Sequence, residues 1–468
     1  MAGTYIPGTS KVLSGVYTLI QAAVEAVTMG ARGIVAYPFT SNWGPANEIK
    51  IILGGSEFKD AYNAEGTSLT AAKIYKHAFK GKPQQLLAYR MTTGAAAKGT
   101  LTINDSADPA VKSLELETLY PSDRAFTVVV KDGISGGKTI DIVEGGVKLL
   151  SVDGGTVDAL ADKLNVSDYV RVKSKGANLP ANNAGVAFTG GNNGSVATAT
   201  EYAAFLDVME ADRQANAFAL DAVTDDAILS TVRAWLKRVR DEGFYTTFVQ
   251  GGGASWDTNI ADANITSKTA NHRGIINVGN GCEGYTAAEM AIFIAARAAS
   301  VALNRTLTDE PVDYATVNKK LKPGERTAAK EAGTLIFVQD GSAILIDEGV
   351  NTLTNPAADE VKEMGKIRVN NALDQIAKDL EAFGNEYKRT RSNTDEARET
   401  YAATVEDSYM KPMSRMEVIQ PGYYYEPDPE YHGKDAVYKP KIDEAFFHAD
   451  ITPVDSMERI YQKIGVHF

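Results

Sequence analysis

The sequence predicts a multidomain chain that combines an α/β domain, an inserted all-β domain and an α+β C-terminal domain, with extended arms at both ends. Its 468 residues suffice for two to four domains at roughly 150 residues each. Helix and strand patterns alternate in the second half, and short strands separated by glycine turns precede them. We expect an N-terminal arm, a part that packs with the α/β domain, the β domain, the α/β domain, the C-terminal domain and a C-terminal strand, at residues 1–20, 21–97, 98–190, 195–350, 351–455 and 456–468.

Composition narrows the classes of partner. The chain has 44% hydrophobic and 23% charged residues and a net charge of −12. An acidic surface repels phosphate, so we expect no nucleic-acid partner. We also expect no membrane insertion, because no stretch of about 18 apolar residues is present. The one cysteine, Cys282, and the lack of a signal-peptide pattern favour folding in a reducing cytoplasm.

The N-terminal arm contains two strand-like stretches among glycine, proline and serine residues. These are Thr4, Tyr5 and Ile6, followed by Val16 and Tyr17. Fully extended, about 20 residues span at most roughly 70 Å, which is far enough to reach a neighbouring molecule. The alternative is an ordinary frayed terminus.

The next two parts differ in pattern. Residues 33–39 and 85–89 are expected to form strands, with a helix over 69–79 between them. From residue 98 on, short strands follow one another, expected at 114–119, 126–131, 139–143, 147–152 and 169–172. Asp-Gly and Gly-Gly pairs between these strands supply the positive φ of tight hairpins. This pattern predicts a small β-sandwich or barrel, with residues 178–194 as its exit linker.

Alternating helices and strands indicate a sheet with helices on its faces. The predicted helices cover 201–213, 225–240 and 286–303, and the predicted strands cover 217–223, 244–250, 274–278, 335–339 and 343–346. A long helix is expected to begin at Asn355 and Pro356 and to carry one apolar stripe. A second helix is expected over 394–410, and residues 421–440 are predicted to be loop.

The C-terminal residues 456–468 are predicted to form a strand. Ile460, Ile464, Val466 and Phe468 are expected on one face, with polar residues on the other. A strand of this kind must pair with a sheet of its own chain or, by β-augmentation, with that of another chain. The periodicity leaves both alternatives open.

No motif predicts catalysis, a metal site or a cofactor. The five histidines lack metal-binding spacing, and the glycine loop at 251–255 lacks the lysine of a phosphate-binding loop. Cys282 precedes a predicted helix and is the one nucleophile candidate, but no histidine is evidently paired with it. We therefore expect a protein that is not an enzyme.

Several stretches, in this order along the chain, resemble the tail sheath proteins of contractile phages, defective prophages and R-type bacteriocins. They lie at residues 11–17, 32–36, 42–45, 86–90, 188–194, 286–289, 351–354 and 451–461. The resemblance implies a subtilisin-like α/β domain without protease activity, in which Ser255 and His272 are structural. It also implies six-membered rings stacked around a tail tube, linked by terminal strands that pair with neighbouring subunits.

The same resemblance implies partners and a location. The partners would be other copies of the chain, the tail tube protein, and baseplate and tail terminator proteins. The subunit would be made in the bacterial host cytoplasm and would end in a virion tail or tailocin particle. A helix would meet the tube through charge, and Lys362, Lys366 and Arg368 are the predicted contacts, with an ordinary solvated helix face as the alternative. Two rivals remain: another assembly protein, such as a tail tube or surface-layer subunit, and an α/β hydrolase.

Overall fold

The computed structural model describes residues 2–3, 16–17, 30–133, 136–194 and 196–464. The chain forms two compact units. The large unit is built from Ala31–Asp374, and the residues from Ser456 onward group with it. The small unit contains Gln375–Asp455.

A seven-stranded sheet is the centre of the large unit. Its strands, from edge to edge, are β17 (Thr334–Leu335), β15 (Ile275–Val278), β14 (Thr247–Gly251), β13 (Ala217–Ala219), β3 (Ile34–Phe39), β5 (Gln85–Arg90) and β4 (Ile49–Ile52). All neighbours are parallel except β4 and β5. The alternating pattern predicted a sheet with helices on its faces, but the predicted strand 343–346 and most of 335–339 lie in a separate three-stranded sheet.

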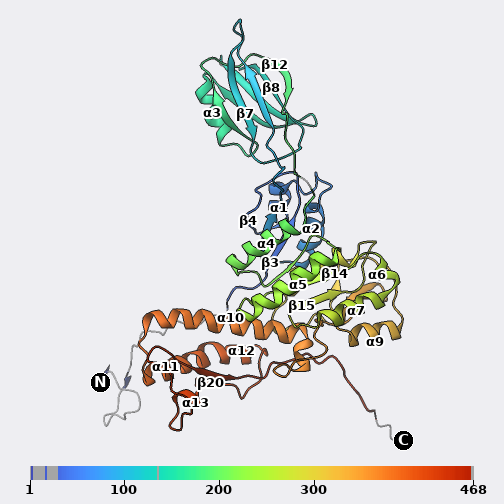
Figure 1. The fold of residues 1–468 in the computed structure, drawn as a ribbon, viewed down its shortest axis with the longest axis vertical. Helices are drawn as coiled ribbons and strands as arrows, with labels where there is room; N and C mark the ends of the chain where they lie inside the picture. The colour runs from blue at the N-terminus through green and yellow to red at the C-terminus, as the bar shows by residue number, and fades with distance from the viewer. Residues whose placement is uncertain (1, 4–15, 18–29, 134–135, 195, 465–468) are drawn as a thin grey trace. The chain divides into compact units, whose positions relative to one another are not determined.

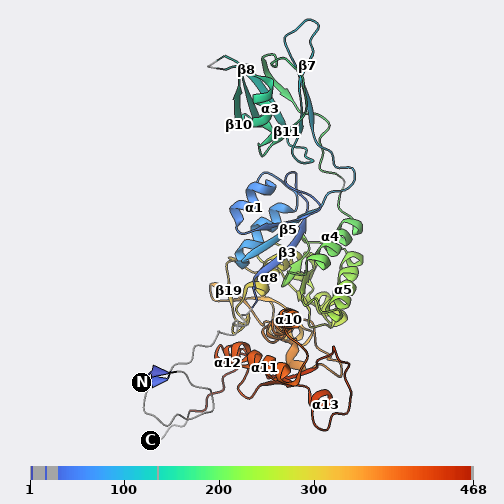
Figure 2. The ribbon, with the colours of Figure 1, turned by 90° about the vertical axis from the view of Figure 1, so that its left-hand side faces the viewer.

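Both faces of this sheet are covered, because successive residues of a strand point to opposite faces and every residue of β3 is buried. In β3, Ile34 and Ala36 join the core formed with helices α4 (Ala199–Asp212) and α5 (Asp226–Asp241). The alternate residues Val35 and Tyr37 join the opposite core, formed with the helices α1 (Gly55–Tyr62), α2 (Ala71–Ala78) and α8 (Ala287–Ser300). Figure 2 shows α4 and α5 on one side of β3 and β5, and α1 on the other.

The region from residue 98 to 190 contains two antiparallel sheets around one core. One sheet has the order β10 (Val147–Gly154), β9 (Lys138–Glu144), β8 (Phe126–Asp132) and β12 (Asn183–Ala187). The other has the order β11 (Val170–Lys175), β7 (Lys112–Thr118) and β6 (Thr100–Asn104). Leu116 from one sheet and Val128 from the other share this core. Figure 1 shows helix α3 (Val157–Asn165), which the sequence pattern missed, beside these strands.

Further elements complete the large unit. A three-stranded sheet has the order β16 (Pro311–Val312), β19 (Ala343–Ile346) and β18 (Phe337–Asp340). The remaining helices are η1 (Phe79–Gly81), α6 (Ser255–Thr258), α7 (Ile260–Ala270), α9 (Pro323–Glu331) and η2 (Lys362–Gly365). No helix in the described part of the chain is long and apolar enough to cross a membrane.

The small unit combines helices with one antiparallel ribbon. The long helix α10 (Ile367–Thr390) runs from the large unit into it. Next come α11 (Asp395–Val405), a π-helical turn η3 (Glu406–Met410), α12 (Lys411–Arg415) and α13 (Pro429–His432). The ribbon pairs β20 (Tyr424–Pro427) with β21 (Phe447–Asp450). The helix predicted over residues 394–410 is confirmed.

Four predictions of secondary structure need correction. The long helix begins at Ile367, because residues 351–366 first fold back in a loop closed by the amide of Asn351, which donates to the carbonyl of Gly365 at 2.9 Å. The predicted loop over residues 421–440 contains β20 and α13, and the predicted linker over 178–194 contains β12. Residues 456–464 form no strand, since no neighbouring strand of the protomer pairs with them.

Candidate functional site

The C-terminal segment, residues 456–464, places apolar side chains in solvent. Ile460, Tyr461 and Ile464 are 67%, 90% and 83% exposed. Val466 and Phe468 lie outside the described residues. Exposing several large apolar groups in one extended stretch is unfavourable unless something covers them. The segment is therefore a candidate interaction surface.

The N-terminal arm is described at four positions. Ala2 and Gly3 form strand β1, which pairs in parallel with β2, formed by Val16 and Tyr17. The strand character predicted at Val16 and Tyr17 is confirmed, and its partner here is the same chain. Thr4, Tyr5 and Ile6 lie outside the described residues. The role of these five residues between subunits stays a prediction.

The ribbon of β20 and β21 is the place in the small unit where a further strand could pair. Its pairing continues beyond the two strands, because the amide of Gln420 donates to Thr452 and that of Val454 donates to Val418, at 2.8 and 2.9 Å. Among the described residues, no third strand pairs with either edge. Backbone groups at the edge of a ribbon without a third strand can pair with another chain.

An aromatic cavity of about 640 Å³ lies beside this ribbon. Tyr425 of β20 and Phe447 of β21 stack at 5.5 Å between ring centroids, and Tyr401 of α11 meets Phe447 edge-on at 4.9 Å. Lys388 and Arg391, near the end of α10, also line the cavity. The small unit therefore presents apolar rings next to a ribbon that carries no third strand among the described residues, which suits an extended apolar segment.

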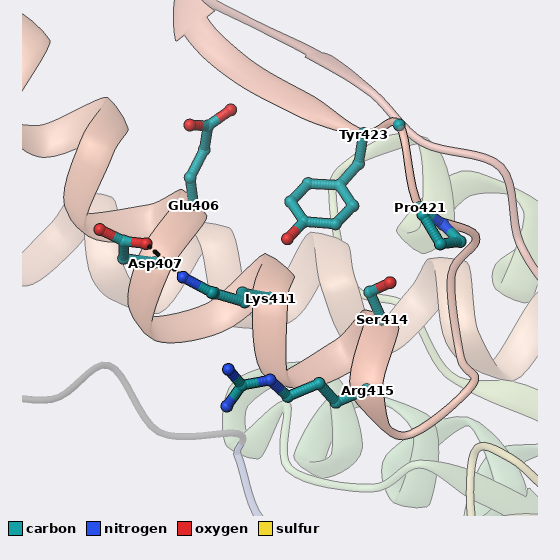
Figure 3. Close-up of a pocket in the computed structure, with 8 residues that line it drawn as sticks. Glu406, Asp407, Lys411, Ser414, Arg415, Pro421 and Tyr423 are labelled. Carbon is teal, nitrogen blue, oxygen red and sulfur yellow. Dashed lines mark hydrogen bonds and ion pairs between the residues drawn. The ribbon is translucent and has the colours of Figure 1, made fainter.

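A second, more polar cavity of about 450 Å³ lies at the π-helical turn (Figure 3). Asp407 and Lys411, one helical turn apart in its lining, form an ion pair at 3.3 Å. Glu406 accepts a hydrogen bond from the amide of Tyr425 at 2.9 Å, which joins the turn to the ribbon. The ion pair and the hydrogen bond give these charged side chains a structural role. None of the contacts pairs a nucleophile with a base.

Two of the three predicted tube contacts have partners within the large unit. Lys366 forms an ion pair with Glu458, and Arg368 donates to the hydroxyl of Ser456 at 2.7 Å. Lys362 is exposed. The three residues also do not share one helix, because α10 begins after Lys366. Contact of Lys362, Lys366 and Arg368 with a tail tube stays a prediction.

The candidate nucleophile Cys282 is inaccessible. Its side chain is fully buried, and burial raises the pKa of the thiol to about 12. Thiolate chemistry requires the opposite shift. Burial likewise lowers the pKa of His272 to about 3, and its Nδ1 accepts a hydrogen bond from the amide of Gly274 at 3.0 Å. Ser255 begins the short helix α6.

The glycine loops of the sequence are explained by close packing. A Cβ on Gly251 would collide with the carbonyl of Ala287 at the start of α8, and one on Gly252 would collide with the ring of Trp256. Asn280, in the loop before α8, makes hydrogen bonds of 2.9 and 2.8 Å to the carbonyl and amide of Phe337. Within the described residues, no cluster of three His, Cys, Asp or Glu side chains could hold a metal ion.

Comparison with known proteins shows which protein family this chain resembles. Residues 195–352 match the family model described as the phage tail sheath protein central domain. This part of the chain is similar to a tail sheath central domain. The predicted resemblance to sheath proteins is thereby confirmed, and the sheath domain contains the strands β13, β14, β15 and β17 of the seven-stranded sheet.

Relatives extend the sheath similarity beyond that domain. The uncharacterized protein YqbK of Bacillus subtilis is 24% identical over 408 residues, covering 81% of each chain. The tail sheath protein of Clostridium phage phiCD119 is 25% identical, covering 50% of this chain and 67% of its own. The crystal structure of the sheath tail protein from Desulfitobacterium hafniense superimposes with a TM-score of 0.71 at 24% identity, covering 97% of this chain and all of that chain. The fold is therefore that of a sheath protein.

Proposed function

We propose that this chain is the structural subunit of a contractile tail sheath and that it assembles by adding terminal strands to sheets of neighbouring copies. The observation that supports this best is the coexistence of the exposed apolar side chains Ile460, Tyr461 and Ile464 with a ribbon in the small unit that carries no third strand among the described residues. Backbone pairing joins such surfaces with little demand on individual side chains.

The proposed acceptor is the ribbon of β20 and β21. A third strand on one edge would pair backbone groups of β20 or β21 that have no strand partner in the protomer. Apolar residues of the added strand would cover the cavity lined by Tyr401, Tyr425 and Phe447. A strand from the N-terminal arm, which includes Val16 and Tyr17, would use the other edge. Each copy would then both contribute and receive strands.

The mechanical role follows from flexible links between rigid subunits. Rings of six copies, stacked around a tail tube, would remain connected through the arms while the units rotate during contraction. The extended assembly would be held behind a kinetic barrier, and no nucleotide would be required. Partners would include the tail tube, baseplate and tail terminator proteins, in a virion tail or tailocin particle.

Deletion of either arm tests the assembly route. Protein lacking residues 457–468, or residues 1–15, is expected to stay folded by circular dichroism and to form no striated tubes in negative-stain microscopy. The matched point variant is Ile460→Ser, and its control is Val166→Ser, which alters an apolar residue 82% exposed in the β region. Long sheaths from both truncated proteins would refute strand exchange. Small oligomers with enzymatic turnover would refute the sheath role itself.

A further inference from the structure

We propose that the large unit contains a binding site for residues 456–458 of its own chain, which fixes where the C-terminal segment leaves the subunit. We call this the exit site. It consists of Thr308, Glu348, Lys366 and Arg368. Its role in assembly rests on the proposed function, whereas its existence does not.

The carboxylate of Glu458 is the centre of the contact. The hydroxyl of Thr308 donates to Glu458 Oε1 at 2.6 Å, and Lys366 forms an ion pair with Oε2. The Thr308 oxygen also accepts a hydrogen bond from the amide of Gly349 at 3.0 Å, which fixes its orientation. The Glu458 side chain is 11% exposed, although its neighbour Met457 is 81% exposed. The side chain of Glu458 therefore packs into the large unit, while that of the preceding residue, Met457, stays in solvent.

A second contact, two residues earlier, sets the register. Arg368 is 8% exposed and donates to the hydroxyl of Ser456 at 2.7 Å. The amide of Glu458 donates to the carbonyl of Ser456 at 3.0 Å, so the chain turns tightly at Met457. The side chains of Ser456 and Glu458 both contact the large unit. The cations that meet them, Lys366 and Arg368, are also two residues apart. A shift of one residue along the chain would break both contacts.

A second carboxylate holds the lysine in place. Oε1 of Glu348, just after β19, forms ion pairs with Lys330 of α9, with Lys366 at 3.9 Å and with Arg459 at 3.4 Å. Burial alone would raise the pKa of Glu458, but hydrogen bonds from Lys366 and Thr308, with the charges of Lys366 and Lys330, lower it overall. Glu458 therefore stays ionised, and its poor exposure limits screening by salt.

The exit site separates the held part of the segment from the free part. Ser456, Glu458 and Arg459 contact their own subunit, and Ile460, Tyr461 and Ile464 are exposed beyond them. A short free arm that starts from a fixed point has a higher effective concentration near one acceptor than an arm with a loose base. The exit site thus directs strand exchange without touching the neighbouring copy.

Trypsin can measure occupancy of the exit site in the unassembled protein. Cleavage after Arg459 requires residues on both sides of it, including 456–458, to enter the protease in extended form. Cleavage after Lys463 uses residues farther along and serves as an internal reference. The ratio of the two initial cleavage rates, measured from intact-mass spectra, reports how often the segment leaves the exit site. Substitutions in the exit site do not alter the sequence around Arg459 or Lys463, so differences in this ratio come from the site.

The expected results separate a specific site from a general charge effect. Lys366→Met should raise the ratio of cleavage after Arg459 to cleavage after Lys463 about tenfold, and the isosteric Thr308→Val about threefold, because each removes a bond to Glu458. The control Lys362→Met removes an equal charge at an exposed lysine and should leave the ratio unchanged. Equal ratios in all four proteins, or an equal rise in the Lys362→Met protein, would overturn the proposal.

Assembly assays separate a failure of the exit-site proposal from a failure of the proposed sheath function. If the parent forms sheaths, Lys366→Met should raise the concentration needed for assembly about fivefold. Lys320→Met, at an exposed lysine outside the predicted tube contacts, should not. If the parent forms no sheaths under any condition, the proposed function fails while the trypsin ratios still decide whether the exit site exists.

Discussion

The seven-stranded sheet of the large unit and the two-stranded ribbon of the small unit differ in how completely each is enclosed. Helices cover both faces of the sheet, and Val35 and Phe218 within it are fully buried. The ribbon lacks further strands in the described chain, and His448 and Ala449 of β21 are exposed. The seven-stranded sheet is therefore enclosed within the protomer, whereas the ribbon has no further strand at either edge among the described residues.

The three tryptophans make this difference measurable. Trp43, Trp235 and Trp256 all lie in the large unit. Tryptophan fluorescence during urea denaturation therefore reports the unfolding of that unit and is insensitive to the small unit. The predictions below concern this transition, in order of decreasing effect.

Phe218→Ala should lower the free energy of unfolding of the large unit by about 4 kcal/mol, because a fully buried ring leaves a cavity. Phe218 stacks on Phe248 at 5.0 Å and meets Trp235 edge-on at 5.7 Å. The control Phe446→Ala removes a ring from the small unit and should leave the tryptophan transition in place. Equal shifts in both variants would mean that the units unfold together.

Acidification should destabilise the large unit through His77. Burial lowers the pKa of this histidine to about 4, with Glu289 partly opposing the shift. Between pH 6.5 and 4 the unfolded chain binds more protons than the folded one, so stability falls as pH falls. At pH 5, the decrease in the free energy of unfolding that is attributable to His77 is about 2 kcal/mol.

The variant His77→Gln isolates this effect. Urea unfolding at pH 6.5 and 5 should show a smaller pH dependence in His77→Gln than in the parent, with His272 supplying the remainder. The exposed His448→Gln is the control and should match the parent. An unchanged slope in His77→Gln would show that His77 is not buried in its neutral form.

Thr286→Ala should lower the free energy of unfolding by about 1 kcal/mol, because it removes the N-cap of the central helix α8. The hydroxyl of Thr286 accepts a hydrogen bond from the amide of Glu289 at 3.2 Å, and Glu289 in turn accepts from the amide of Thr286 at 2.9 Å. Thr286→Ser keeps the oxygen and should recover most of the loss. If Thr286→Ser lowered the free energy of unfolding as much as Thr286→Ala, the stabilisation would come from the methyl group of Thr286 and not from its hydroxyl.

Tyr425→Ala should leave the tryptophan transition unchanged and prevent formation of sheaths. The substitution removes a ring that stacks on Phe447 at the proposed acceptor. Tyr425→Phe keeps the ring and should assemble like the parent, as judged by sedimentation and negative-stain microscopy. Normal assembly of the alanine variant would exclude this side of the ribbon as the acceptor.

Sequence patterns predicted those elements whose burial is strongly periodic. The runs that became β3, β5 and α5 are apolar at the expected spacing, and all lie within a few residues of the predicted limits. Helix α7 was missed because its buried face includes Asn264 and Ser267. Polar residues in a core remove the contrast on which a periodicity argument depends.

The candidate site was predicted in part, because sequence gives the character of a segment and not its partner. The spacing of Ile460 and Ile464 predicted an apolar strand face, whereas the structure places both side chains in solvent in a segment that forms no strand. Glu458 was missed, since its partners Thr308 and Lys366 lie 150 and 92 residues away along the chain. For the same reason Lys366 appeared to be a free surface charge.

The burial of Cys282 has a consequence for an assembly of many identical copies. Any accessible thiol would be repeated in every copy and could cross-link neighbours once the particle met an oxidising medium. The chain has one cysteine, enclosed beneath the sheet and protonated at neutral pH. In the proposed sheath, contacts between copies would therefore stay free of disulfides in air.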